Sequence, residues 1–432
     1  MAREMKDSGI EWIGNLPSHW SRNKVIRLFS VIGSGTTPKT TDETAYIGDV
    51  NWLQSGDING TFIYTSKNTI SQTTKEYYSV LKTYSAPFII VAMYGASIGN
   101  ASISLIDACV NQACCVLAKP KINLHYAFYT LKAAQSYLTK QAVGGGQPNI
   151  SQDKIKTLWL PVPSNIEQQK IVDYLDRKCA EIDRVLEKTR ASIEEYKKLK
   201  QSVITQAVTK GVRGEREMKD SGIEWIGEIP AEWKISRIKY VSSFEPPCDT
   251  SRLSPDSVIT YTPMEYIKNG YYVPNTATLS SLSTSLTSYQ SGDIVMAKVT
   301  PCFENGNISI MNNLSSAFGL GSSELFVFRA KSIHTQFLFY WLRNNRFVQT
   351  ACSTMTGTGG LKRVSSLFVK DSSLAVPPES EQIEIANYLD KKCSEIDTLI
   401  SKKEQFITEL ESYKKSLIYE YVTGKKEAMN DL

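Results

Sequence analysis

The segment EQQKIVDYLDRKCAEID (Glu167–Asp183) is repeated as EQIEIANYLDKKCSEID (Glu381–Asp397). The two segments are identical at 11 of 17 positions, at an offset of 214 residues. A second pair of segments agrees with the first. MKDSGIEWIGNLPSHW (residues 5–20) and MKDSGIEWIGEIPAEW (residues 218–233) share 12 of 16 positions at an offset of 213. Because the two offsets are nearly equal, one repeat of about 214 residues occurs twice, head to tail.

Two long segments that differ in sequence lie between these matches, and they carry the positive charge. Residues 20–163, the first basic module, hold 13 Lys and Arg against 7 Asp and Glu. Residues 233–377, the second basic module, hold 13 against 8, whereas the rest of the chain holds 23 against 29. Basic modules joined by acidic connectors indicate a phosphate backbone as partner.

The repeated Glu-rich segments predict two long helices, each with a coiled-coil seam. Apolar residues recur in alternating steps of three and four, which is the spacing of a coiled coil rather than of a globular helix. The predicted seam residues are Val172, Leu175, Cys179, Ile182, Leu186, Ile193, Tyr196 and Val203 in the first helix, and Ala386, Leu389, Cys393, Ile396, Ile400, Ile407, Leu410 and Leu417 in the second.

The helix ends are marked by proline and glycine. Pro163 and Pro377 stand upstream as starts, and Gly211 and Gly424 follow as stops. The seam from residue 172 to 207 covers 36 residues, which is about 54 Å of helix. A helix of that length with one apolar seam needs a partner, and we expect the other repeat's helix to pair with it antiparallel, about an approximate two-fold axis.

Lys200 and Lys414 fall at equivalent positions of this seam. A polar seam residue can fix the register or orientation of two helices at some cost in stability. The alternative is that each lysine extends out of the seam into water.

Both basic modules are rich in Val, Ile, Tyr, Phe and Thr, with frequent Gly, Asn and Asp. This composition predicts short strands with loops, together with one amphipathic helix near residues 125–140 and 335–349. SAPFIIVAMYG (Ser85–Gly95) and GDIVMAKV (Gly292–Val299) are predicted to be buried strands.

Loops of the modules supply side chains that can pair with base edges. An ordinary polar loop is the alternative for each of these residues. The DNA-binding candidates are Gly35, Thr36, Thr37, Lys39, Gln54, Ser55, Gly145, Gly146, Gln147 and Asn149 in the first module, and Lys298, Thr300, Asn305, Thr356, Thr358, Lys362 and Arg363 in the second.

No catalytic or metal site is predicted. In GSGTTPKT (Gly33–Thr40), Pro38 replaces the second glycine of a phosphate-binding loop and has no N–H to donate. Glu265 and Lys268 lack the spacing of a nuclease, and EPPCD (Glu245–Asp249) is not a methyltransferase motif. Eight cysteines without a CxxC pair and three scattered histidines argue against zinc and against a disulfide scaffold.

No apolar run approaches the roughly 20 residues of a membrane span, and the N-terminal residues lack the apolar core of a signal peptide. We therefore expect a cytoplasmic protein.

The DSGIEWIGxIPxxW segment, the basic module and the EQxxIxxYLDxKxxEID helix, each present twice, resemble the specificity subunit of type I restriction-modification enzymes. The resemblance implies an α+β fold: two mixed α/β target-recognition domains held apart by two long helices that form an antiparallel coiled coil, in a pseudo-two-fold tandem repeat. The predicted divisions are target-recognition domains at 1–163 (with its Trp-rich segment 5–20) and 214–377 (with 218–233), and helical regions at 164–213 and 378–432.

The resemblance also implies the partners. They are double-stranded DNA read as a bipartite asymmetric site, two modification subunits and restriction subunits, with no membrane. S-adenosylmethionine, ATP and Mg would then belong to partner subunits, and this chain would be non-catalytic and hold no cofactor. Two alternatives remain: the recognition part of a single-chain restriction enzyme, or a coiled-coil scaffold with basic modules that bind protein or RNA.

Overall fold

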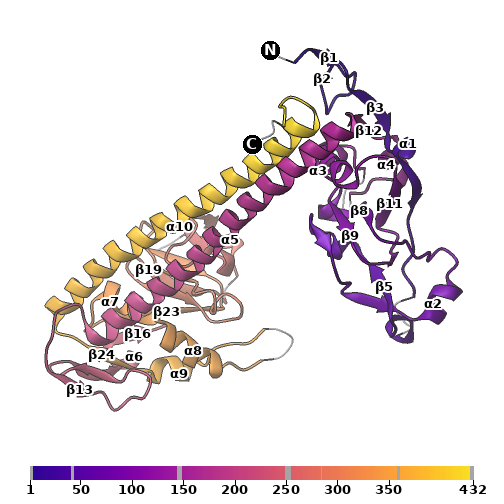
Figure 1. Cartoon of the computed structure of the whole chain (residues 1–432). Coiled ribbons are helices and arrows are strands. Elements are labelled where there is room, and N and C mark those ends of the chain that lie inside the picture. The colour runs from indigo at the N-terminus through magenta and orange to yellow at the C-terminus, as the bar shows by residue number, and fades with distance from the viewer. Residues whose placement is uncertain are drawn as a thin grey trace. The chain divides into compact units, whose positions relative to one another are not determined.

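The computed structural model describes residues 3–39, 43–143, 148–248, 254–283, 285–357 and 361–428. The chain divides into two compact units: unit 1 is Met1–Thr189 with Gln405–Leu432, and unit 2 is Arg190–Glu404. The two long helices, α5 (Asn165–Lys210) and α10 (Glu379–Val422), each contribute to both units (Figure 1). Each unit therefore contains helix segments from both repeats.

The strands of unit 1 are β1 (Met5–Asp7), β2 (Asn15–Pro17), β3 (Ser21–Lys24), β4 (Phe29–Gly33), β5 (Val50–Leu53), β6 (Phe62–Ile63), β7 (Asn68–Ile70), β8 (Phe88–Ala92), β9 (Ala101–Ser104), β10 (Cys109–Val110), β11 (Cys114–Pro120) and β12 (Trp159–Val162). Those of unit 2 are β13 (Met218–Asp220), β14 (Glu228–Pro230), β15 (Lys234–Arg237), β16 (Ser242–Phe244), β17 (Val258–Thr262), β18 (Thr276–Thr278), β19 (Thr287–Gln290), β20 (Ile294–Ala297), β21 (Ile308–Ile310), β22 (Phe318–Gly321), β23 (Leu325–Ala330) and β24 (Ser373–Val376).

The two units share a common core arrangement of strands although their modules differ in sequence, and each sheet order also shows strands without a counterpart, β6 in unit 1 and β19 in unit 2. The main sheet has the order β4-β11-β8-β9-β6 in unit 1 and β16-β23-β20-β21 in unit 2. A second sheet is ordered β10-β5-β7 in unit 1 and β18-β17-β22-β19 in unit 2, and each contains one parallel pair, β5 with β10 and β17 with β22. Small hairpins (β1 with β2, β13 with β14) and pairs (β3 with β12, β15 with β24) complete both.

The two strands predicted to be buried lie inside these sheets, as β8 and β20. In β8, Ile89 and Val91 face the core that contains α3 (Leu124–Lys140), and Phe88, Ile90 and Ala92 face the core beneath the second sheet. Because successive side chains of a strand point to opposite faces, a strand covered on both sides is apolar throughout. The apolar runs that predicted these strands have this cause.

The predicted module helix is confirmed in the first module as α3, which Asn123 caps by accepting the N–H of Tyr126. The prediction of one helix over 335–349 is wrong, because the segment forms α7 (Thr335–Leu342) and α8 (Asn345–Ser353). The Asn344 side chain accepts the N–H of Phe347 and starts α8. The shorter helices are α1 (Val25–Leu28), α2 (Gln72–Tyr77), α4 (Gln152–Thr157), α6 (Ile238–Val241) and α9 (Ser366–Asp371).

Helices α5 and α10 are longer than their seams, with 46 and 44 residues. Helix α5 begins seven residues before the predicted seam because Ser164 and Glu167 form a reciprocal cap: each backbone N–H is accepted by the other's side chain, at 3.2 and 3.3 Å. The predicted stops are confirmed: Gly211 and Gly424 have φ of +78° and +72°, the left-handed conformation that ends many helices.

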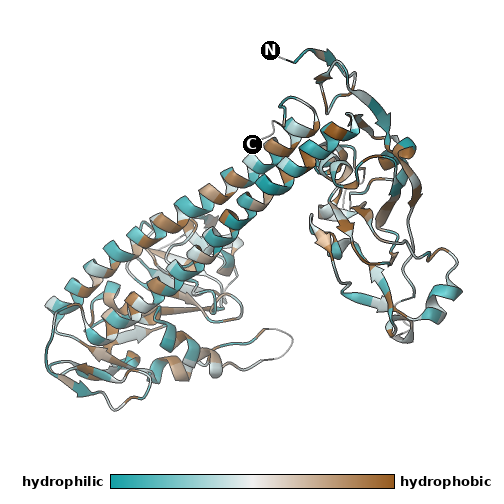
Figure 2. Ribbon diagram, in the orientation of Figure 1, coloured by the Kyte–Doolittle hydropathy of each residue, from teal (hydrophilic) through white to brown (hydrophobic). Residues whose placement is uncertain are grey.

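The two helices pair antiparallel within each unit. In unit 1, Lys414 Nζ contacts Asp183 Oδ1 at 2.6 Å, and in unit 2 Lys200 Nζ contacts Asp397 Oδ2 at 2.6 Å. These are the same contact with the repeats exchanged, since 200 and 414, and 183 and 397, are equivalent positions. The seam lysines therefore reach across to the partner helix, and their side chains are only 13% and 17% exposed. Figure 2 shows apolar residues recurring among polar ones along both helices.

The Trp-rich segments are hydrogen-bonded to the starts of the long helices in the same way in both units. Trp20 Nε1 donates to Glu167 Oε1 and Trp233 Nε1 donates to Glu381 Oε2, both at 3.1 Å. An arginine closes each cluster: Arg3 pairs with Glu167 and Arg216 with Glu381, at 2.7 Å. The sequence segments that repeat best are thus those that contact each other.

Each core is completed by the end of the other repeat's helix. Leu417, Ile418 and Val422 of α10 are buried in the core of unit 1, and Ile204 and Val208 of α5 are buried in the core of unit 2. A module and the N-terminal part of its own helix do not close the core alone.

Replacing Glu167 with Gln should lower the stability of unit 1 by about 1–3 kcal/mol near pH 7, because the carboxylate accepts several hydrogen bonds. Burial raises the pKa of Glu167, but hydrogen bonds from His19, Trp20 and Ser164 outweigh it and lower the pKa to about 2. Since this pKa lies below the ordinary value of about 4.3, the stabilisation is full above that value and is lost as the pH falls toward 2.

Chemical unfolding near pH 7 and near pH 3 measures this effect. The difference between the wild type and Glu167→Gln should shrink at the lower pH, whereas Glu4→Gln, at an exposed carboxylate, should change little at either. A difference that stays constant between the two pH values would contradict the assignment.

Truncating the end of one long helix should loosen the unit whose core it completes. Ile418→Ala should destabilise unit 1, and Ile204→Ala at the equivalent position should destabilise unit 2, each by about 2–5 kcal/mol. Amide hydrogen exchange resolved by peptide measures both variants. We expect faster exchange in β8 for Ile418→Ala and in β20 for Ile204→Ala; the reverse assignment, or loosening of only the helix itself, would refute the account.

Candidate nucleic-acid interface

Two of the loops predicted to read bases in the first module meet at residues 111–113. Thr37 Oγ1 donates to Gln112 Oε1 at 2.5 Å, which fixes the loop of residues 33–39 there. The backbone N–H of Asn111 donates to the carbonyl of Leu53 at 3.0 Å, so the loop that contains Gln54 and Ser55 starts at the same place.

The third predicted loop of the first module reaches this place through the end of β8. Met93 N–H donates to Ala113 O at 2.8 Å, and Ile150 N–H donates to Met93 O at 2.9 Å. Asn149 forms a β-bridge with Tyr94. The structure therefore brings all three loops together, although they lie far apart in the sequence.

The candidates of the first module differ in exposure. Lys39 and Asn149 are exposed, Thr36, Thr37, Gln54 and Ser55 are half-buried, and Gly35 is buried. A Cβ atom at Gly35 would lie 1.7 Å from the carbonyl oxygen of Val110. Gly35 thus lets the loop pass close to β10 and offers no side chain to a base. Gly145, Gly146 and Gln147 lie outside the described residues.

The two predicted loops of the second module also come together. Arg363 forms β-bridges with both Val299 and Thr356. The N–H of Thr300 donates to Lys362 O at 2.9 Å, and the N–H of Lys362 donates to Thr300 Oγ1 at 2.9 Å. Thr356, Lys362 and Arg363 are therefore held against the loop that follows β20.

Asn305, Thr356, Lys362 and Arg363 are exposed, Lys298 is half-buried and Thr300 is buried, while Thr358 lies outside the described residues. The Thr300 hydroxyl already holds the backbone of Lys362. Thr300 therefore stabilises the loop instead of presenting its hydroxyl to a base.

The described ends of the last predicted loop are attached at equivalent places in both units. In unit 1 Asn149 forms β-bridges with Tyr94, which follows β8, and with Val143. In unit 2 Arg363 forms β-bridges with Val299, which follows β20, and with Thr356. β8 and β20 hold equivalent places in the main sheets. One scaffold therefore presents two different loop sequences at one site.

Two basic candidates of the second module are paired with carboxylates. Arg363 contacts Glu324 through two hydrogen bonds of 2.9 and 2.7 Å, and these lower the pKa of Glu324. Lys298 lies 3.7 Å from Glu245. The carboxylates hold both cations in position near the loops and reduce the net positive charge there.

Sequence reasoning missed three residues at the junction of the first module, Tyr94, Asn111 and Gln112. Tyr94 is 43% exposed beside Asn149. The signal was available, since polar residues directly after a buried strand lie at a sheet edge, as Asn111 and Gln112 do after β10. They were missed because the candidate loops were identified by their glycine content.

The predicted seam residues are all at least partly buried. Tyr196, Val203, Ile400, Ile407 and Leu410 are half-buried and the other eleven are buried. A second buried stripe that was not predicted, with Ile204, Val208, Ile418 and Val422, lies beside the seam. It arises because the helix ends pack on a module as well as on each other.

A cation from the module helix lies against an Asn-Gly turn in both units. Lys132, in FYTLK (Phe128–Lys132), donates to the carbonyl of Gly60 at 2.9 Å. Arg343, in FYWLR (Phe339–Arg343), donates to Asn269 Oδ1. Burial lowers the pKa of both side chains. These turns, Asn59–Gly60 and Asn269–Gly270, have no counterpart in the sequence-based list of candidates.

Within the described ranges, no three His, Cys, Asp or Glu residues gather in a way that could hold a metal ion. Among the same residues, no helix has the length and apolarity needed to cross a membrane.

Comparison with known proteins gives a family match in both repeats. The model of the type I restriction modification DNA specificity domain matches residues 17–195 and 230–409. The specificity subunit of the Escherichia coli type I restriction enzyme EcoAI is 29% identical over 191 residues, which are 43% of this chain and 32% of that protein. That of MjaVIII from Methanocaldococcus jannaschii is 26% identical over 323 residues, 71% of each chain.

The match thus spans about a third of the length of the EcoAI subunit, and 31% of the EcoEI subunit from Escherichia coli. Among solved structures, a chain from work on complex assembly and conformational transition of the type I R-M system has a TM-score of 0.71 at 15% identity, over 95% of this chain and 99% of that one. The HsdS subunit from Thermoanaerobacter tengcongensis has a TM-score of 0.51 at 14% identity, over 95% and 98%.

At these identities the structural likeness concerns the fold. It agrees with the α+β tandem repeat and with the long antiparallel helices. Since the family model covers most of the sequence, once in each repeat, the chain belongs to the family of type I restriction modification DNA specificity domains.

Proposed function

We propose that this chain is the DNA sequence-recognition and assembly subunit of a type I restriction-modification complex in the cytoplasm. One observation carries the proposal: two modules with a common core arrangement of strands present different loop sequences at equivalent places, after β8 and after β20. A scaffold of that kind suits the recognition of two different sequences. Both modules carry net positive charge, whereas the connecting segments carry net negative charge. Positive modules suit the phosphate backbone that flanks each base.

Each module reads one half of a bipartite asymmetric site. The loops that meet at residues 111–113 read one half-site, and the loops around Thr300 and Arg363 read the other. They carry Lys, Arg, Asn, Gln and Thr, whose side chains discriminate base edges in the major groove. The half-sites differ because the loops differ.

The long helices set the number of unread base pairs between the half-sites. Helices of 46 and 44 residues without an interruption suit that role. Their pairing is defined by the reciprocal contacts Lys200–Asp397 and Lys414–Asp183.

Two modification subunits dock on the helices. The outward faces carry exposed apolar side chains at repeat-equivalent positions: Val185 with Tyr413 in unit 1, and Leu399 with Leu199 in unit 2, all between 41% and 54% exposed. Two similar apolar surfaces suit two copies of one partner. The modification and restriction subunits bind S-adenosylmethionine, ATP and Mg, and this chain binds none of them.

Exchanging residues 20–163 for the corresponding module of a relative should change one half of the methylated motif and leave the other half and the gap unchanged. The reason is that each module has its own sheets and its own reading loops. Sequencing of methylated adenines in the host measures this outcome. The matched control exchanges residues 233–377, which should change only the other half.

Deletion of the chain should abolish methylation of the whole motif in a host with no second specificity subunit for that motif. An unchanged methylation pattern after deletion would reject the proposal. It would favour a scaffold that binds protein or RNA.

A further inference from the structure

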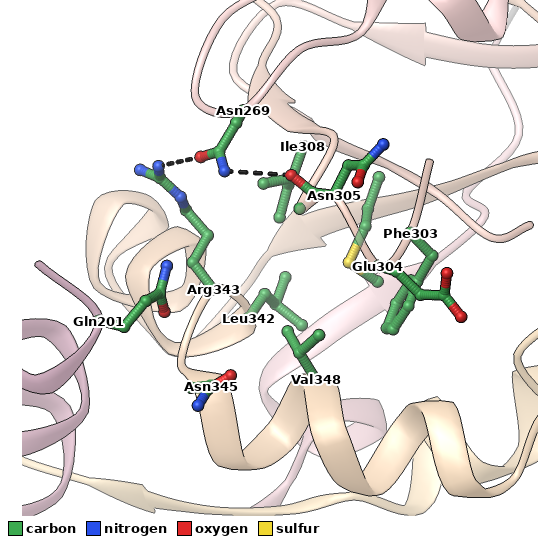
Figure 3. A pocket seen from close by; sticks show the side chains of 12 residues that line it. Gln201, Asn269, Phe303, Glu304, Asn305, Ile308, Leu342, Arg343, Asn345 and Val348 are labelled. Carbon is green, nitrogen blue, oxygen red and sulfur yellow. Dashed lines mark hydrogen bonds between the residues drawn. The ribbon is translucent and has the colours of Figure 1, made fainter. Parts of the chain in front are cut away.

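Unit 2 contains a cavity of about 200 Å³ between the main sheet, α7, α8 and the end of α5. Figure 3 shows Gln201 and Arg343 on one side of it and Phe303 with Glu304 on the other. The wall between them is apolar and consists of Met296, Phe303, Ile308, Leu342 and Val348. The cavity is smaller than the pockets that hold drug-sized ligands, and it has room for about one ring.

Arg343 is the cation of this cavity, and it is only 8% exposed. Its guanidinium donates to Asn269 Oδ1, as drawn in Figure 3, and lies over the ring of Phe339, 4.8 Å from the centroid. No carboxylate of the described residues lies within 4.0 Å of it. Burial lowers its pKa, which reflects the cost of a charge without a counter-ion.

The two nearby carboxylates are already engaged. Asp390 Oδ1 accepts the hydroxyl of Tyr340 at 2.6 Å and the amide of Gln336 at 2.8 Å. Both carboxylate oxygens of Asp397 accept hydrogen bonds from Lys200. A guanidinium has five N–H donors in a planar fork that matches a carboxylate, and most of those on Arg343 are unused.

Gln201 adds a second polar group that lacks a partner. Its Oε1 is buried and, among the described residues, has no hydrogen-bond partner. Rotating this amide by half a turn would present its NH₂ donors to the same space. Glu304 at the rim is exposed and negative.

We propose that this cavity binds a small organic carboxylate, whose charged group pairs with Arg343 and whose apolar body contacts Phe303, Ile308 and Val348. The site lies in unit 2. The equivalent cation of the first module, Lys132, already donates to the carbonyl of Gly60. The proposal goes beyond the proposed function and does not rest on it, although Asn305, a DNA-binding candidate, also lines the cavity.

The test uses the full chain and two matched probes, 4-fluorobenzoate and the neutral 4-fluorobenzamide, followed by fluorine NMR. We expect the benzoate to bind and the benzamide to bind at least about tenfold more weakly, since charge-assisted hydrogen bonds contribute most of the affinity. Equal binding of the two probes, or no benzoate binding at millimolar concentration, would overturn the proposal.

Three variants locate the site. Arg343→Gln should weaken benzoate binding at least about tenfold, and Lys132→Gln at the equivalent position should leave it unchanged. Glu304→Gln should tighten binding a few-fold, because it removes a like charge from the rim. The Glu304 side chain is exposed, so this variant tests the proposal even where Arg343→Gln does not fold. The assignment would be contradicted if Glu304→Gln did not tighten benzoate binding. It would also be contradicted if Lys132→Gln weakened benzoate binding as much as Arg343→Gln does.

Discussion

The packing of each module against the helix end of the other repeat is the interaction on which the rest of the structure depends. Ile204 and Val208, which belong to the first repeat, lie in the core of unit 2, and Ile418 and Val422 lie in the core of unit 1. Burial of a large apolar side chain contributes about 1.5–3 kcal/mol. A domain is stable by only about 5–15 kcal/mol, so several such side chains are decisive. Both modules therefore depend on the pairing of the helices.

Polar contacts give that pairing its direction and register. The apolar seam alone does not define one alignment, because its pattern repeats every seven residues. The seam lysines define a single alignment, since Lys200 contacts Asp397 and Lys414 contacts Asp183 only when the helices run antiparallel in one register. The aspartates are about half exposed, so each pair contributes little stability. Its main effect is on which pairing forms.

Much of this architecture was readable in the sequence. The repeat, both helices with their glycine stops, and the buried strands β8 and β20 follow from periodicity and apolar runs. The break between α7 and α8 could not be predicted, because Asn344 caps a helix inside a segment whose apolar pattern continues. The cap formed by Ser164 and Glu167 has a sequence signature too, since Ser-x-x-Glu stands directly before the helix. The convergence of three reading loops at Asn111 depends on sheet order, which local sequence does not determine. Local sequence likewise does not determine which aspartate each seam lysine contacts.

Carbodiimide cross-linking of the full chain tests the reciprocal pairing most directly, because it joins a lysine to a carboxylate that it already contacts. Mass spectrometry on a mixture of unlabelled and isotope-labelled chains separates links within a chain from links between chains. We expect Lys200–Asp397 and Lys414–Asp183, both within one chain. Links of Lys200 to the acidic residues that flank Lys414, or Lys200–Asp183 links that join two chains, would contradict the account.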